Sequence, residues 1–405
     1  MPGRMDFDFT FGGAKSALSP TRESDDPLRI LILGNFSGVR DTTKPRVPLR
    51  QRPIVRLDID NFDAVLRRFS PQVQLGSDAS NSLAETVEIQ ELEDFRPERL
   101  CQKLPTLRRL VELRKSLLNP ATFEQAAAQL KQQWMVAPTI PDGSFNEPPP
   151  PVTSAENDAG TLERILGQAT PSPKSPAGGS PFDVQRAIGQ MIQPYLVPAA
   201  DPNQKVYLAA LNNALGEQLR TVLHDRSFQS LEATWRSLRG LISKIEDEGQ
   251  VQIHLLDIAS DELLHQVPAN DDDLQQWSLY RRLADEPAQV PGTTPWSLII
   301  GDFTITARTN DLTLLGALTA VAQHLRTPVI AAGDSTVLGA SSLTAGLDPA
   351  DWQPLAAESD QYWQALRGSP AAAWVGLVCP RVLLRLPYGQ ETDEIESFEF
   401  EEFVS

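Results

Sequence analysis

The stretches Leu31-Ile32-Leu33-Gly34-Asn35-Phe36-Ser37 and Leu298-Ile299-Ile300-Gly301-Asp302-Phe303-Thr304 share one plan: an apolar run, then Gly, an amide or acid, Phe and a hydroxyl. An apolar run of this length that ends at Gly is typical of a strand covered on both faces. Each stretch precedes a polar loop and an amphipathic helix, predicted over 61–69 and 311–325. The sequence therefore predicts an α/β fold, a mixed sheet covered by helices, with a helical hairpin over 205–246. Two strand-loop-helix units are joined by a Pro-rich linker.

The charge of the chain is distributed unevenly. The 405 residues suffice for two or three domains with their own cores, and the formal net charge is -17. Residues 1–136 carry 20 Lys and Arg against 18 Asp and Glu, whereas residues 137–405 carry 16 against 35. An acidic surface of that size argues against nucleic acid or an anionic membrane as a partner. The more basic first part is suited to face the acidic second part of its own or another copy.

Cysteine content and hydropathy bear on location. The only cysteines are Cys101 and Cys379, which imply no disulfide framework and fit a reducing compartment. There is no apolar segment of 18 residues, and the N-terminus lacks a basic flank followed by an apolar core. We therefore expect a soluble cytoplasmic protein without membrane insertion.

Composition divides the chain into four segments. Residues 1–27 are polar, with Phe7, Phe9 and Phe11 alternating with Asp and Thr. This period-two pattern fits an extended arm that adds as an edge strand to another chain, or a disordered leader. We predict a first domain over 28–136, a Pro/Ser/Gly-rich linker over 137–181 and a second domain over 182–405.

The linker contains a short helical segment at 161–167. Its apolar residues Leu162, Ile165 and Leu166 fall on one helical face, with Glu163 and Arg164 between them. So short a helix is unstable alone. An apolar-faced segment with flexible flanks is typical of a docking motif that folds on binding, and the alternative is a transient helix on its own domain.

A second candidate binding surface is the basic face of the helix predicted over 100–118. Arg108, Arg109, Arg114 and Lys115 lie on this face, opposite a Leu-rich stripe. The face is suited to an acidic partner, such as the last 15 residues, which hold seven carboxylates between Glu391 and Glu402. The alternative is a solvated surface.

Motifs for catalysis are not evident. We find no phosphate-binding P-loop, no dinucleotide fingerprint and no nucleophile elbow around 34–38. The carboxylates of Asp58, Asp60 and Asp63 lack the Gly and Glu of a calcium loop, so Asp60 or Asn61 is expected to cap the following helix. His254 is expected to be structural. We therefore predict no catalytic residues, metal ligands or cofactor, and no enzymatic activity.

Several of these stretches together resemble the contractile sheath of type VI secretion systems. Residues 28–134 resemble the small sheath subunit through the turn at 33–38 and the segments 59–63 and 93–98. Residues 161–402 resemble the large subunit through 228–235, Gly301-Asp302-Phe303 and the strand 328–332. The most specific part is Pro380 to Gly389, the core motif with Arg381, Arg385 and Tyr388, followed by Phe398-Glu399-Phe400-Glu401-Glu402.

This resemblance implies a structural function. In the family the two subunits interlock into a protomer, and protomers stack around an inner tube that contraction ejects. It implies other sheath protomers, the inner-tube protein, the baseplate and a recycling AAA+ ATPase as partners. The ATPase would grip the segment Leu162 to Leu166.

One departure concerns the end of the chain. The large subunit of the family continues past the acidic-aromatic region, whereas this sequence stops at Ser405. Either the protein is a shortened fusion, or a completing sheath chain supplies the missing part.

An alternative function is a sheath-derived adaptor or regulatory protein that binds sheath or baseplate without contracting. A third is a hydrolase with a crevice at the ends of the parallel strands.

Overall fold

The computed structural model describes residues 26–38, 47–76, 85–134, 202–245, 249–268, 271–289, 294–340, 342–343, 348, 350 and 352–403. The predicted arm up to residue 25, the linker over 137–181 with the segment 161–167, and the helix expected over 182–197 lie outside these residues. The described chain forms two compact units, one over 1–111 and 212–405 and the other over 112–211.

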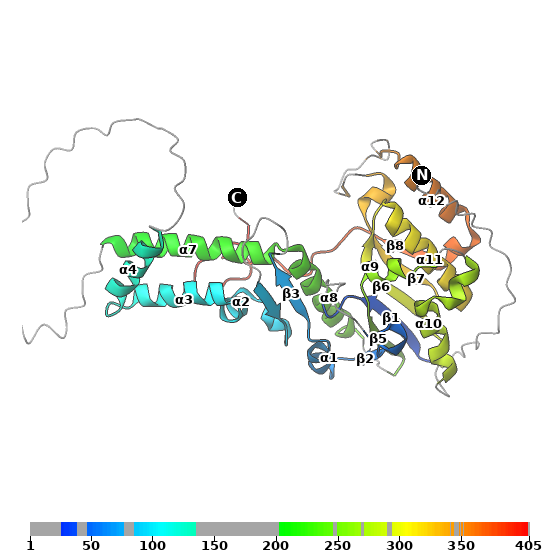
Figure 1. Cartoon of the computed structure of the whole chain (residues 1–405), viewed down its shortest axis with the longest axis horizontal. Coiled ribbons are helices and arrows are strands. Elements are labelled where there is room, and N and C mark those ends of the chain that lie inside the picture. Colours follow the sequence, from blue (N-terminus) through cyan, green and yellow to red (C-terminus); the bar gives the residue numbers. More distant parts are fainter. Residues whose placement is uncertain are drawn as a thin grey trace, which may run out of the picture. The chain divides into compact units, whose positions relative to one another are not determined.

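The first unit is built on a six-stranded mixed sheet. Its strands run in the order β2 (Val55–Leu57), β5 (Val251–Asp257), β1 (Leu28–Gly34), β6 (Leu298–Ile305), β7 (Val329–Gly333) and β8 (Val375–Val378). All neighbours are parallel except β2, which is antiparallel to β5. The two echoed stretches form β1 and β6, which lie side by side (Figure 1). The predicted mixed sheet is therefore confirmed, and both sequence parts contribute strands to it.

Side chains of β1 alternate between two cores, one on each face of the sheet. Ile32 points into a core with α1 (Phe62–Phe69), α8 (Arg226–Ile242) and the end of α7 (Pro202–Leu223). Leu31 and Leu33 point into another core with α9 (Ser260–His265), α10 (Ser278–Gln289) and α11 (Thr309–Leu325). Both faces of β1 are thus covered, as its continuous apolar run predicted.

Smaller elements complete the first unit. A separate antiparallel pair consists of β3 (Gln72–Leu75) and β4 (Glu85–Glu88). We call residues 28–134 the small part and residues 205–405 the large part. The second helix of the small part, α2 (Pro97–Lys103), begins at Pro97 and is separated by Leu104 from α3 (Pro105–Leu118). The other elements among the described residues are α12 (Ala357–Gly368) and the 3-10 turns η1 (Leu49–Gln51), η2 (Leu92–Phe95), η3 (Asp271–Gln276), η4 (Ser335–Leu338) and η6 (Pro370–Trp374). Among the described residues no helix is long and apolar enough to cross a membrane.

The second unit comprises the end of α3, α4 (Phe123–Trp134) and the beginning of α7. The rings of Phe123 and Tyr207 lie 6.4 Å apart, and the Gln204 amide donates to the Leu117 carbonyl at 2.6 Å. These contacts hold the helices of this unit together.

The break predicted in the helical hairpin near Asp225 is confirmed, because Asp225 separates α7 from α8 and caps α8 by accepting from Ser227 N and Phe228 N at 2.8 and 3.0 Å. Two other local predictions need correction. The apolar stripe of α8 packs mainly against β3 and η2, and only the end of α7 joins the same core, so the two helices do not pack along their whole length as the hairpin prediction implied. Asn61 occupies the cap position of α1, but its Oδ1 accepts from Asp58 N at 3.0 Å, so it caps no helical N–H group.

His254 is a structural residue of β5. It is 9% exposed, and its ring packs edge-on against Trp296 with 5.3 Å between centroids. Burial lowers the pKa of His254 to about 4, and the nearby positive charge of Arg29 contributes. The imidazole is therefore neutral at physiological pH.

We predict that His254 makes the protein acid-sensitive. Its pKa in the folded state lies below the ordinary value of 6.5. The unfolded chain therefore binds the proton more readily, and stability falls as the pH drops from about 6.5 to 4, by up to about 3 kcal/mol. His254→Gln should flatten the pH profile of the unfolding free energy in this window. An unfolding profile as steep in His254→Gln as in the unchanged chain would contradict the prediction.

A matched pair of glycine substitutions tests the backbone. Gly38 has φ of +70°, and a Cβ there would lie 2.4 Å from the Gln72 carbonyl oxygen, whereas nothing lies within 4 Å of a Cβ at Gly240 in α8. Gly38→Ala should destabilise the chain by more than about 1 kcal/mol. Gly240→Ala should stabilise it by about 0.5–1 kcal/mol, through helix propensity. Urea unfolding measures both, and equal effects would contradict the turn geometry.

Candidate functional site

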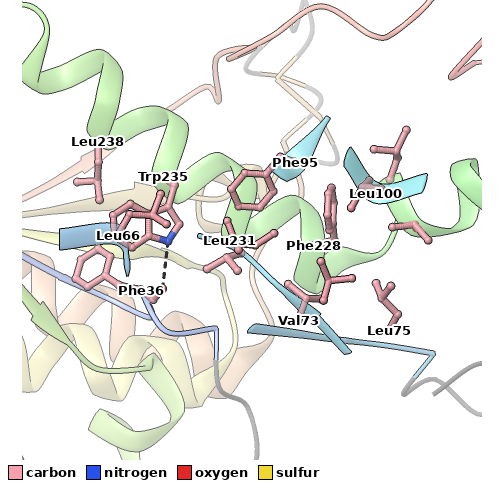
Figure 2. Packing of buried hydrophobic residues seen from close by; sticks show 14 of the residues in the cluster. Phe36, Leu66, Val73, Leu75, Phe95, Leu100, Phe228, Leu231, Trp235 and Leu238 are labelled. Carbon is pink, nitrogen blue, oxygen red and sulfur yellow. Dashed lines mark hydrogen bonds between the residues drawn. The ribbon is translucent and has the colours of Figure 1, made fainter. Parts of the chain in front are cut away.

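The candidate site is the part of α8 on which segments from both parts of the sequence pack. Trp235 is fully buried at its centre, and its indole N–H donates to the Phe36 carbonyl at 3.1 Å. Its ring contacts Phe36, Phe62 and Phe69, with centroids 5.8 to 6.1 Å apart. Figure 2 shows this hydrogen bond and the neighbouring side chains. A helix of the large part is therefore anchored in the turn after β1 and in α1 of the small part.

The same helix binds the end of the described chain. We call residues 385–403 the C-terminal strap. Its apolar side chains Tyr388, Ile395, Phe398 and Phe400 are buried in the core that contains α8. Arg220 of α7 donates to the Glu401 carbonyl at 3.0 Å, and His224 stacks on Phe403 with 5.2 Å between centroids. The acidic tail predicted from sequence is thus attached through its apolar side chains and Glu402, whereas its other glutamates are exposed.

A buried ionic network fastens the strap to α8. Arg385 Nε lies 2.9 Å from Glu232 Oε1, and its two terminal nitrogens lie 2.7 and 3.0 Å from the Glu402 oxygens. Arg236 Nε also donates to Glu232, at 2.7 Å. Glu232 and Glu402 are 5% and 3% exposed. Two arginines thus balance two buried carboxylates, the condition under which buried charges are tolerated.

Tyr388 is embedded in this network. Its backbone N–H donates to Glu402 Oε2 at 2.8 Å, and the Arg385 guanidinium lies 4.3 Å from its ring centroid. Burial raises the pKa of Tyr388 to about 12, and Glu232 adds to this effect. Burial alone would lower the pKa of Arg385, but the hydrogen bonds to Glu402 and Glu232 outweigh it and raise that pKa. The phenol is neutral and the guanidinium is charged at physiological pH.

The strap also reaches the small part directly. Arg96, which precedes α2, donates to both carboxylate oxygens of Asp393, at 3.0 and 3.4 Å. Both side chains are more than a third exposed, so this ion pair contributes at most about 1 kcal/mol. The ion pair adds little stability, but it connects the strap to a residue of the other sequence part and so helps to orient the strap.

The residues of the predicted core motif separate in the structure. Arg385 and Tyr388 both belong to the network. Arg381 does not belong to it, since its guanidinium is exposed and donates to Thr304 Oγ1 of β6 at 3.2 Å. Sequence reasoning gave no site role to Glu232, Arg236 and Glu402. The signal was a Glu and an Arg four residues apart on α8, flanking its apolar stripe.

The other predicted binding residues fall into two groups. On α3, Arg108, Arg109 and Lys115 are exposed and Arg114 is half-buried, and the Arg108 guanidinium donates to the Gln102 carbonyl. The docking residues Leu162, Glu163, Arg164, Ile165 and Leu166 lie outside the described residues. Within the described parts of the chain, no group of three or more His, Cys, Asp or Glu is placed to hold a metal ion.

The described residues form an α/β protein in which two sequence parts share one sheet and the cores on both of its faces. Residues 16–134 match the VipA family of type VI secretion systems, and residues 205–405 match the N-terminal domain of the VipB/EvpB tail sheath family. The chain therefore belongs to the type VI secretion sheath proteins, with a small-subunit part and a large-subunit part on one polypeptide.

Two curated relatives from Pseudomonas aeruginosa agree with this assignment. The type VI secretion system sheath protein TssC1 is 32% identical over 197 residues, which are 48% of this chain and 40% of TssC1. The sheath protein TssB1 is 25% identical over 115 residues, which are 27% of this chain and 66% of TssB1. The chain thus spans less than two thirds of each relative.

A matched pair of arginine substitutions tests the network. Arg385→Ala leaves Glu402 buried without its ionic partner and should destabilise the chain by about 3–5 kcal/mol. Arg381→Ala removes an exposed side chain of the same motif and should change stability by no more than about 0.5 kcal/mol. Denaturant unfolding of the full chain measures both. A loss at Arg385 no larger than that at Arg381 would contradict a role of the network in holding the strap.

Proposed function

We propose that this chain is a structural component of the contractile sheath of a type VI secretion system. The observation that carries the proposal is the position of β1 of the small part between β5 and β6 of the large part. A sheath protomer made from two subunits must move as one body when the lattice rearranges. A shared sheet and core supply that rigidity, because packed interiors transmit displacement with little deformation.

The proposed partners follow from the family. Other sheath protomers would surround the chain in a helical lattice around an inner tube, and contraction of that lattice would eject the tube. A baseplate would seed the assembly, and a recycling AAA+ ATPase would grip Leu162 to Leu166. The acidic charge of residues 137–405 supports protein partners rather than nucleic acid. In this function the chain works in the cytoplasm and needs neither a cofactor nor catalysis.

Electron microscopy tests the proposal. The purified chain would be imaged alone, with the inner-tube protein, and with both this protein and a chain that carries the remainder of a large sheath subunit. We expect tubes or rings of regular diameter in at least one of these samples, because interlocked protomers present repeated lateral surfaces. Arg385→Ala, which should loosen the strap, should reduce their number, and Arg381→Ala serves as its control.

Folded, monodisperse chain without ordered assemblies in all three samples would contradict a sheath function. Binding to preformed sheath or baseplate under those conditions would instead support the adaptor function.

A further inference from the structure

The C-terminal strap has an acidic outer face. Its side chains Ile395, Phe398 and Phe400 are buried in the core that contains α8, and the glutamates between and before them are exposed. We call these exposed residues the outer glutamates: Glu391, Glu394, Glu396, Glu399 and Glu401. Negative charges this close along the chain repel one another, so a cationic surface that approached the strap would be attracted to it.

The chain itself does not neutralise the outer glutamates. The salt bridges of the strap use its other acidic residues, Asp393 with Arg96 and Glu402 with Arg385. Arg220 donates to the backbone carbonyl of Glu401, whose carboxylate accepts from a backbone N–H group. Within the described part of the chain, none of the outer glutamates forms a salt bridge. They are therefore available to an ionic partner outside this chain.

A surface of opposite charge lies on α3. Arg108, Arg109 and Lys115 are exposed, on the side of the helix away from its buried leucines. We call these three residues the α3 cations. Glu112 is also exposed on this side, so three positive charges and one negative charge leave a net charge of +2. The Arg108 guanidinium donates to the Gln102 carbonyl, which leaves its charge unbalanced. In the described residues, none of the α3 cations forms a salt bridge.

We propose that the α3 cations of one copy of this chain bind the outer glutamates of a second copy. The two surfaces differ, so each copy can offer α3 to one neighbour and its strap to another. A contact of this heterologous kind generates rings or helical filaments when it is repeated. The inference rests on the proposed sheath function and names one contact between its protomers. Each exposed ion pair contributes little alone, so the contact should be weak between two copies and sensitive to salt.

Charge reversal tests the contact by sedimentation velocity of the full chain. The first variant carries Arg108→Glu, Arg109→Glu and Lys115→Glu, and the second carries Glu394→Lys, Glu396→Lys and Glu399→Lys. We expect the unchanged chain to associate at about 0.01 M salt and to do so less at about 0.15 M, where the Debye length falls to about 8 Å. Each variant alone should associate at least about tenfold more weakly, because like charges then face each other.

Restoration of binding identifies the two surfaces as partners. An equal mixture of the two variants should associate again, because each then meets a surface of opposite charge on the other. All six substitutions in one chain should restore self-association for the same reason. All of these side chains are exposed, so the melting temperatures should stay close to that of the unchanged chain.

The matched control reverses an exposed basic pair elsewhere. Arg67→Glu with Arg68→Glu, at the end of α1, should leave the association unchanged. A chain that stays monomeric at low salt, a loss that neither the mixture nor the combined variant reverses, or an equal loss in the control would overturn the proposal. Regular tubes whose formation ignores the charge reversals would overturn this contact and leave the sheath function standing. Restored pairwise association without tubes in any sample would support the contact and contradict the sheath function.

Discussion

The placement of β1 between β5 and β6 is the constraint on which the rest of the structure depends. β1 is paired with β5 along its whole length, from Leu28 to Gly34, and with β6 from Ile30 to Leu33. Withdrawing the small part would leave two open strand edges in the middle of the sheet and two uncovered cores. The large part is therefore incomplete without β1, and the two sequence parts are one folding unit in energetic terms.

Covalent fusion has a physical consequence for such a unit. When two chains must meet before the central strand can insert, association carries the entropic cost of a bimolecular step. A linker between the parts converts this step into an intramolecular one, and it also fixes their ratio at one to one. The buried network of Arg385, Glu232 and Glu402 adds a geometric demand, because buried charges are tolerated only when all of them are paired. The network therefore favours one position of the strap on α8 over other positions in which a carboxylate would be unpaired.

The sequence predicted the local elements of this arrangement better than their connections. The apolar runs of β1 and β6 predicted covered strands, because residues on both sides of a parallel strand are buried. The insertion of β1 between two strands more than 200 residues away left no local trace, since strand order depends on long-range pairing. The same holds for the site. Arg385 and Tyr388 were found through a shared motif, whereas Glu232 lies 153 residues from Arg385 and is recognisable only as a charge beside a buried stripe.

The two edge strands of the sheet, β2 and β8, differ in how readily another strand could pair with them. Inside the sheet, every strand gains its neighbour within the chain, and the order of strands is fixed by the two cores. At β2 the edge is three residues long and charged, so it offers little to another strand. At β8 the edge is apolar and leads into the exposed segment with Val382 and Leu383, which ends at the buried network of Arg385. The element that ties the two sequence parts together and the edge most open to addition thus follow one another along the chain.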